Sequence, residues 1–348
     1  MSHKTIPSAD IITFLRMAGE YSVADVRSPS EYKAGHIPGA INIPLFNDME
    51  REIVGTKYKK EGRLQSILSG LELSGPSLRN KLEMALQAAG GGKLLAYCWR
   101  GGMRSEAMSW LFSLGGIDTV VLDGGYKSYR RYVLGELAAE RKMIILGGLT
   151  GSGKTRILEY LSGKGQQIID LEGLANHKGS AFGSLGQPPQ PSSEHFANLL
   201  CEKLRKCDPD KPVWVEDESR NIGSVFMPGE FYLNMQRNIT IVLLMDSMTR
   251  LPRLLEEYSC YPSEELSASV EKISRRMGGE KAKEALEAIK RGDFARAITV
   301  TLDYYDRTYL FGLKRKDENR VVLINTDTDD VEVNAEKVAG AAREMNLL

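Results

Sequence analysis

The eight residues 148–155 constrain the fold of this chain more than any other stretch, because they follow the pattern G-x-x-x-x-G-K-T. The glycines of that pattern let backbone N–H groups wrap a diphosphate. Lys154 then reaches its outer oxygens, and the Thr155 hydroxyl could hold Mg²⁺. The apolar run 142–147 comes before the loop, and a helical pattern begins after it at 157. Strand, loop and helix in this order predict a phosphate-binding P-loop in an α/β domain. The expected diphosphate ligands are Gly148, Thr150, Gly151, Ser152, Gly153, Lys154 and Thr155.

A second strand–loop–helix segment lies at residues 94–114, where an apolar run ends at Cys98 and a glycine-containing loop closes at Arg104. Backbone N–H groups at such a loop favour the reactive thiolate, and the guanidinium offers a planar fork for an oxyanion. The alternative is a buried cysteine that merely ends a strand. The glycine pair and the arginine favour a catalytic pair, Cys98 and Arg104. The expected oxyanion loop consists of Trp99, Arg100, Gly101, Gly102, Met103 and Ser105.

Composition narrows the class of protein. A length of 348 residues predicts two domains. The net charge of zero means that any nucleic-acid contact must rely on local basic patches. Four cysteines without a CxxC pair predict a reducing compartment, and four scattered histidines offer no zinc spacing. We expect a cytoplasmic protein without haem, flavin or zinc, and no run is apolar enough to span a membrane.

Acidic residues follow two further apolar runs that read as strands. The first run, 167–171, leads into a polar loop, and the second, 212–215, ends in three consecutive acids. The second is the position of a Walker B element, whose acid could hold Mg²⁺ through water. The alternative is that these acids cap the strand and pair with Arg220. The candidates for this second part of the site are Asp170, Glu172, His177, Lys178, Ser180, Glu216, Asp217, Glu218 and Arg220.

Basic residues gather in three short stretches. Residues 126–132 interleave aromatic and basic side chains, a composition that suits RNA, where aromatic rings stack on bases and cations pair with phosphates. A helix that connects two domains explains the same stretch equally well. The candidate nucleic-acid ligands are Lys127, Arg130, Arg131, Arg275, Arg276, Lys314, Arg315 and Lys316.

The first 130 residues resemble a rhodanese-like sulfurtransferase domain. The resemblance rests on residues 25–27, 31–32, 35–40, 122–125 and the loop from Cys98 to Ser105, with a polar insertion at 47–75. We expect an α/β chain, with an N-terminal rhodanese-like parallel-sheet domain at 1–135. A P-loop NTPase-like α/β domain follows at 136–348, with a helical region around 250–316. Within the rhodanese pattern His36 is expected to stabilise a turn. The Cys-x5-Arg loop is one residue longer than in many rhodaneses and resembles that of cysteine phosphatases, which suggests a phosphate-like ligand.

Across its full length the chain resembles the bacterial tRNA 2-selenouridine synthase family, on the motifs at 98–105, 170–180 and 216–223. The resemblance implies a transferase that replaces sulfur by selenium in 2-thiouridine at the tRNA wobble position, with selenophosphate as donor. It also implies an S-geranyl intermediate made from geranyl diphosphate. The implied partners are tRNA and the selenophosphate-producing enzyme. The sequence suggests that the Cys98 loop handles selenium, carried as a perselenide, and that the P-loop handles geranyl diphosphate.

Two other classes of protein remain open. P-loops ordinarily bind nucleoside triphosphates, so the chain could be a nucleotide-driven sulfurtransferase, or a cysteine phosphatase fused to a kinase, that acts on a small molecule. It could also be a tRNA-binding protein without activity. The presence of Cys98, Arg104, Lys154 and Thr155 argues against that last class.

Overall fold

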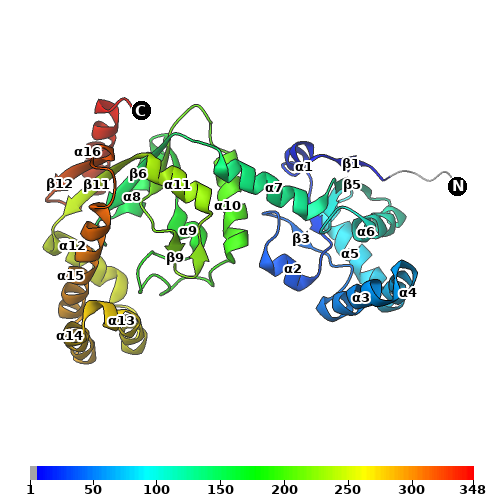
Figure 1. Ribbon diagram of the computed structural model, residues 1–348, viewed down its shortest axis with the longest axis horizontal. Helices are drawn as coiled ribbons and strands as arrows, with labels where there is room; N and C mark the ends of the chain where they lie inside the picture. The colour runs from blue at the N-terminus through cyan, green and yellow to red at the C-terminus, as the bar shows by residue number, and fades with distance from the viewer. Residues whose placement is uncertain (1–5) are drawn as a thin grey trace. The chain divides into compact units, whose positions relative to one another are not determined.

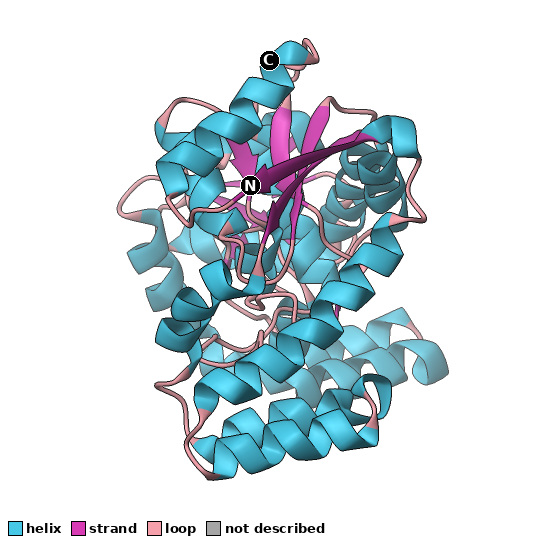
Figure 2. Cartoon of the chain, turned by 90° about the vertical axis from the view of Figure 1, so that its left-hand side faces the viewer, coloured by secondary structure: helices cyan, strands magenta, loops and turns pink. Residues whose placement is uncertain are grey.

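The computed structural model describes residues 6–348, which form two compact units. One unit ends at Glu136 and takes in Ala197–Leu199, and the other begins at Leu137. Each unit contains a five-stranded parallel sheet with helices, so the expected α/β class is confirmed. Figure 1 gives the element labels used below, and Figure 2 separates helices from strands by colour.

The sheet of the first unit has the strand order β1-β5-β4-β2-β3. Its central strand β4 (Lys93–Tyr97) is buried over residues 94–97, as a strand covered on both faces must be. Helices α5 and α6 pack on one face through Ala85, Met108 and Phe112. The other elements are β1 (Ser8–Ala9), α1 (Ile11–Met17), β2 (Val23–Asp25), α2 (Pro29–Ala34), β3 (Ile41–Asn42), α3 (Asp48–Glu61), α4 (Arg63–Ser74), η1 (Gly75–Ser77), α5 (Leu78–Ala89), α6 (Met103–Leu114), β5 (Asp118–Leu122) and α7 (Gly125–Ala138).

The polar insertion at 47–75 forms two helices, α3 and α4. The side chain of Asn47 accepts the Glu50 N–H, and the Glu50 carboxylate accepts the Asn47 N–H, so a capping box starts α3. Gly62 separates the helices with φ of 90°, a backbone conformation that side chains other than glycine rarely adopt.

The second unit has the strand order β12-β11-β6-β8-β7, so β6 (Met143–Gly148) is central and the P-loop leaves the middle of the sheet. Helices α8 and α16 contribute Ile157, Leu161 and Val338 to the core cluster on the strands. The other elements up to β11 are α8 (Lys154–Gly163), β7 (Gln167–Ile169), α9 (Leu171–Ala175), α10 (Ser193–Arg205), β8 (Val213–Glu216), β9 (Asn221–Ile222), β10 (Val225–Phe226), α11 (Gly229–Arg237) and β11 (Ile239–Met245).

The helical region follows β11 and has its own apolar cluster, which includes Val270, Ala285 and Val300. Figure 1 shows α13 and α14 side by side with α15. The elements are α12 (Ser247–Tyr258), α13 (Ser263–Met277), α14 (Gly279–Lys290) and α15 (Phe294–Leu313), followed by η2 (Glu318–Arg320), β12 (Val321–Thr326) and α16 (Val331–Glu344).

Candidate functional site

Cys98 lies directly after β4, where parallel strands present their carboxyl ends, and only 4% of the residue is exposed. Burial raises the pKa of its thiol, but the Ser105 hydroxyl and the backbone N–H groups of Arg100, Gly102 and Ser105 outweigh burial and hold this pKa below its ordinary value. The Ser105 oxygen is 3.3 Å from the sulfur. The loop therefore favours a thiolate, the reactive form of cysteine.

Two glycines let this loop pack against the turn before α7. The N–H of Tyr126 donates to the Cys98 carbonyl at 2.8 Å. A side-chain carbon at Gly125 would lie 2.4 Å from that carbonyl oxygen, and one at Gly101 would lie 2.6 Å from the Leu122 carbonyl oxygen. Both glycines have positive φ. A side chain at either position would push the loop away from the strand ends.

Arg104 is paired with a carboxylate. Its guanidinium donates to Glu31 at 2.7 Å, and the two side chains are 17% and 21% exposed. Burial raises the pKa of Glu31, but the bond to Arg104 outweighs burial and keeps this pKa below its ordinary value. Two of the five donors of Arg104 are thus engaged. An incoming oxyanion would use the remaining donors or displace Glu31.

A buried arginine that the sequence does not single out as functional supports the strand ends of the first unit. Arg27 is fully buried, pairs with Asp25 at 2.6 Å and donates to the Gly35 carbonyl. Its guanidinium lies 3.7 Å from the ring centre of Tyr126. Tyr97 donates to Asp25 at 2.7 Å, which ties β4 to β2. The sequence signal was the Asp25-Val26-Arg27 run.

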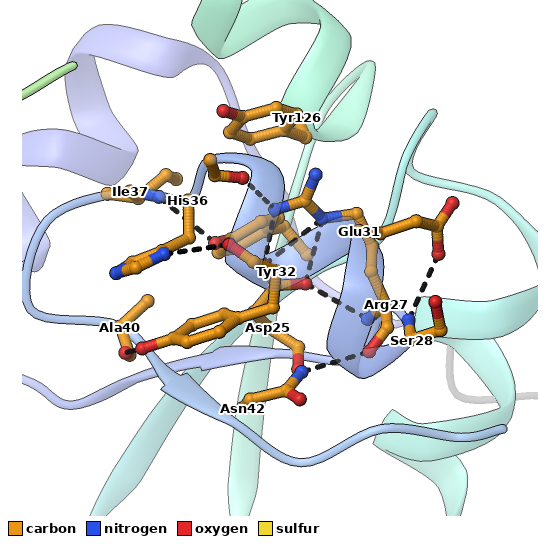
Figure 3. Close-up of polar contacts among 12 residues, drawn as sticks. Asp25, Arg27, Ser28, Glu31, Tyr32, His36, Ile37, Ala40, Asn42 and Tyr126 are labelled. Carbon is orange, nitrogen blue, oxygen red and sulfur yellow. Dashed lines mark hydrogen bonds and ion pairs between the residues drawn. The ribbon is translucent and has the colours of Figure 1, made fainter. Parts of the chain in front are cut away.

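His36 lies in the same cluster and has the structural environment expected of a turn residue. Its ring stacks on that of Tyr32 with 3.8 Å between centroids, and its Nδ1 is 2.9 Å from the Tyr32 carbonyl oxygen (Figure 3). Burial lowers its pKa.

In the P-loop, Lys154 and Thr155 begin α8 and reach toward the strand ends. The Lys154 ammonium donates to the Gly148 carbonyl at 3.4 Å. The Thr155 hydroxyl donates to Glu216, the last residue of β8, at 3.3 Å. The other carboxylate oxygen of Glu216 accepts the N–H groups of Leu171 and Glu172. The acid at the Walker B position therefore faces the P-loop threonine.

Three carboxylates lie together beside Lys154. Burial, followed by the charges of Glu172 and Asp170, raises the pKa of Glu216 to about 8. Burial and the charge of Glu172 also raise the pKa of Glu218 well above its ordinary value. The carboxylates of Glu172 and Glu218 both approach Gly179. These side chains bind protons more tightly than free carboxylates, so they are suited to proton transfer.

Two arginines of α12 bind carbonyl groups of the P-loop, a role that the sequence did not predict. Arg250 is 1% exposed, pairs with Asp306 and donates to the Thr150 carbonyl at 2.8 Å. Arg253 donates to the Gly151 carbonyl at 3.2 Å. Because these bonds occupy carbonyl groups, they favour a loop whose N–H groups remain available to a ligand.

The remaining second-site candidates have other partners. Asp170 caps α9 by accepting the Gly173 N–H, and Lys178 pairs with Glu257 of α12. His177 is buried against Gly183 and Gly223, and burial lowers its pKa. Arg220 is exposed. Of these four side chains, Asp170 acts on the carboxylates beside Lys154 through its charge.

Asp217 and Lys316 bind one another, so the charge of Lys316, a candidate RNA ligand, is already paired. Asp217 also accepts the Tyr309 hydroxyl at 3.1 Å, and Lys316 also donates to Thr240. The Lys316 side chain is only 16% exposed. Of the other basic candidates, Arg130 is half-buried and the rest are exposed: Lys127, Arg131, Arg275, Arg276, Lys314 and Arg315.

A narrow apolar pocket with a cavity volume of about 40 Å³ adjoins the P-loop at Thr150. Its walls come from α12 to α15 and from the loop after α9, where Ser180 is one of its few polar residues. Apolar lining residues include Leu254, Val270, Ile289, Ala297, Ile298 and Leu302. The sequence did not predict this pocket, because its walls come from six separate segments.

Among residues 6–348, no group of three or more His, Cys, Asp or Glu side chains is arranged to hold a metal ion. No helix in the same range is long and apolar enough to cross a membrane. Mg²⁺ at Thr155 therefore remains a prediction.

Comparisons with known proteins agree on one family. A model described as tRNA 2-selenouridine synthase AAA domain matches residues 141–339, and a rhodanese-like domain model matches residues 11–132. A tRNA 2-selenouridine synthase of Nitrosomonas europaea is 32% identical, over 89% of this chain and 93% of its own. One of Pseudomonas putida is 36% identical, over 92% and 94%. The structure of a tRNA isopentenylpyrophosphate transferase from Bacillus halodurans is 13% identical, over 60% and 98%, with a TM-score of 0.34, too low to support any inference.

Proposed function

Because this chain belongs to the tRNA 2-selenouridine synthase family, we propose that it is a tRNA-modifying transferase that replaces the sulfur of wobble 2-thiouridine by selenium. Selenophosphate is the proposed selenium donor, and its producing enzyme a proposed partner. S-geranyl-2-thiouridine, made from geranyl diphosphate, is the proposed intermediate.

The apolar pocket beside the P-loop carries the geranyl part of this proposal. Its walls are almost wholly apolar, as those of small-molecule sites usually are, and its cavity of about 40 Å³ would have to widen to admit a prenyl chain. Burial of each CH₂ group contributes about 0.8 kcal/mol, so a ten-carbon chain would gain much of its affinity here. Thr150 belongs both to the pocket wall and to the P-loop. A ligand with an apolar tail and a diphosphate head matches the chemical character of both.

The first reaction forms a carbon–sulfur bond. The thiocarbonyl sulfur attacks C1 of the geranyl group, the C1–oxygen bond breaks, and diphosphate leaves with the electron pair. Lys154 is proposed to stabilise the charge on the leaving diphosphate. The base loses its N3 proton as the sulfur becomes a thioether. Glu172, whose ionised form is favoured by the charge of Lys154, would accept that proton.

The second reaction needs selenide. Selenium in selenophosphate is already at the oxidation level of selenide, so a perselenide on Cys98 would require an oxidant. We therefore replace that expectation by attack of the Cys98 thiolate on phosphorus, which breaks the phosphorus–selenium bond and releases selenide. Water then hydrolyses the thiophosphate. Selenide adds at C2 of the geranylated base and expels geranylthiolate.

Purified protein with 2-thiouridine tRNA and geranyl diphosphate tests the first reaction. We expect S-geranyl-2-thiouridine, detected by mass spectrometry, without any nucleoside triphosphate, because the leaving diphosphate drives the step. A strict requirement for ATP would contradict this proposal and support a nucleotide-driven sulfurtransferase or kinase fusion.

Variants of α15 test the pocket. Ala297→Leu places three extra carbons in the pocket wall and should raise the KM for geranyl diphosphate about tenfold or more, while inhibition by inorganic diphosphate stays unchanged. Ala295→Leu, on the same helix but outside the pocket lining, is the matched control. An equal KM for both variants would place the prenyl chain elsewhere.

A further inference from the structure

A second cavity borders the P-loop on the side of β11 and β12. It is an open cleft of about 670 Å³ at the carboxyl ends of these strands, and its lining includes Leu149, Asp246, Leu310, Asn325, Thr326 and Asp327. Leu149 precedes Thr150, which lines the apolar pocket. The two cavities thus meet the P-loop at neighbouring residues, one apolar and the other carrying carboxylate, amide and hydroxyl groups.

The last turns of α15 place an exposed aromatic–cation pair next to this cleft. Phe311 is 62% exposed, and the guanidinium of Arg315 lies 5.0 Å from its ring centre. Leu310, which is 40% exposed, lines the cleft, and Lys314 follows it one helical turn later and is also exposed. Exposed aromatic rings beside arginine are what proteins use to stack unpaired bases.

We propose that this cleft binds the unpaired tRNA nucleotide whose sulfur accepts the prenyl group. Phe311 and Arg315 form the surface on which its base stacks. The inference rests on the proposed function, because an acceptor sulfur must approach C1 of the donor beside the diphosphate. The apolar pocket would hold the prenyl chain, so the acceptor enters through the other cavity that borders the loop.

The charged residues in and around the cleft indicate which part of the nucleotide enters it. Asp246 and Asp327 repel phosphate but can accept N–H groups of a base edge, and Asn325 can donate and accept. Asp246 already accepts the N–H groups of Met248 and Thr249. Lys314 and Arg315 lie outside the lining, in the turn that follows α15, where they can pair with the sugar–phosphate backbone. The base therefore enters the cleft and the phosphates stay at its rim.

A nucleobase could also come from a free nucleotide whose phosphates occupy the P-loop. The experiment therefore measures the affinity of the full-length protein for two ligands: an anticodon stem-loop RNA with 2-thiouridine at the wobble position, and ATP. The variant is Phe311→Ala, and Phe311→Tyr tests whether another aromatic ring rescues binding. Phe226→Ala is the matched control, since Phe226 is 57% exposed in the same unit but lies on β10, outside the cleft lining.

We expect Phe311→Ala to weaken RNA binding about 5- to 150-fold, the loss that removal of one base–aromatic stack produces. Phe311→Tyr and Phe226→Ala should bind the RNA as the unchanged protein does, and geranyl diphosphate should bind equally to all of them. Equal RNA affinity for Phe311→Ala would overturn the inference and leave the proposed function intact. Weaker ATP binding with unchanged RNA binding would assign the cleft to a free nucleotide. No RNA binding by the unchanged protein would contradict the proposed function itself.

Discussion

The Cys98 loop and the P-loop are built alike but present different groups. Each follows the central strand of a parallel five-stranded sheet and leads into a helix. In the first loop, N–H groups and the Ser105 hydroxyl bond to a sulfur of the protein itself. In the second, the corresponding strand ends in Gly148, and the charged groups nearby are Lys154 and a set of carboxylates. The first loop activates a nucleophile, whereas the second is suited to stabilise a leaving group.

The balance of charge around the two loops also differs. In the Cys98 loop the nearby cation, Arg104, is paired with Glu31. Around the P-loop, burial raises the pKa of Glu172, Glu216 and Glu218, and the charge of Glu172 raises the pKa of the other two further. The same strand–loop–helix backbone can therefore serve different chemistry. The charge at each loop is set by residues that lie far from the loop in the sequence.

The variants Lys154→Ala and Cys98→Ser test most directly whether the two loops catalyse separate reactions. Lys154→Ala should lower geranylation about 10²- to 10³-fold, since it removes charge stabilisation of the leaving diphosphate, and should still convert tRNA that already carries S-geranyl-2-thiouridine. Cys98→Ser should geranylate normally and form no 2-selenouridine, because an alcohol is a far weaker nucleophile than a thiolate. Mass spectrometry of the wobble nucleoside measures both products.

Loss of both products in both variants would contradict the assignment of separate reactions to the two loops. That result would mean that the loops act in one step. Formation of 2-selenouridine by Cys98→Ser would remove the thiolate from the mechanism.

A smaller effect is expected for Arg104. If its free donors bind selenophosphate, Arg104→Ala should raise the KM for selenophosphate about ten- to a hundredfold, the value of a charge-assisted contact. Glu31→Gln, which weakens the competing pair, should lower that KM. The two changes are compared by initial rates of selenation of pre-geranylated tRNA. An unchanged KM in Arg104→Ala would show that the guanidinium only holds Glu31.

The carboxylate cluster predicts that the P-loop unit loses stability as pH rises. The folded state raises the pKa of Glu216 from 4.5 to about 8, so the protonated side chain is favoured by folding. The resulting stabilisation is complete below the unfolded value and is lost as pH rises through about 8, on the order of a few kcal/mol. Glu172→Gln removes the largest charge effect on Glu216 and should reduce this loss.

Hydrogen exchange of β8 peptides at pH 5 and pH 8, analysed as a free energy of opening, measures this effect. Glu264→Gln, an exposed acid in the first turn of α13, is the control. The same pH dependence in Glu172→Gln and in unchanged protein would rule out mutual repulsion in the cluster.

The smallest effect concerns Ser105. Its hydroxyl helps to lower the pKa of Cys98, so Ser105→Ala should move the pH profile of thiol alkylation toward higher pH. Ser109→Ala, a buried serine one turn later on α6, should leave the profile unchanged. An identical profile for Ser105→Ala would assign the thiolate to the backbone N–H groups alone.

The sequence by itself determined the α/β class, both strand–loop–helix segments and the family. Apolar runs, glycines at defined spacings and the residues Cys98 and Lys154 are contiguous features, and contiguous residues fix local structure directly. The two helices α3 and α4 were missed inside a stretch that reads as a polar insertion, because their apolar residues remain largely exposed. Leu64 is 67% exposed and Leu71 is 63% exposed.

Only the tertiary structure decided which partners the site residues have. Glu31 meets Arg104 from 73 positions away, Arg250 reaches the Thr150 carbonyl across 100, and Lys316 binds Asp217 across 99. The apolar pocket likewise needs segments from Thr150 to Tyr305. Periodicity and spacing describe neighbours along the chain, whereas charge pairing and cavity shape depend on packing between segments far apart in the sequence. For that reason the chemistry of each loop could be predicted from the sequence, whereas the residues that adjust its charge and pKa values could not.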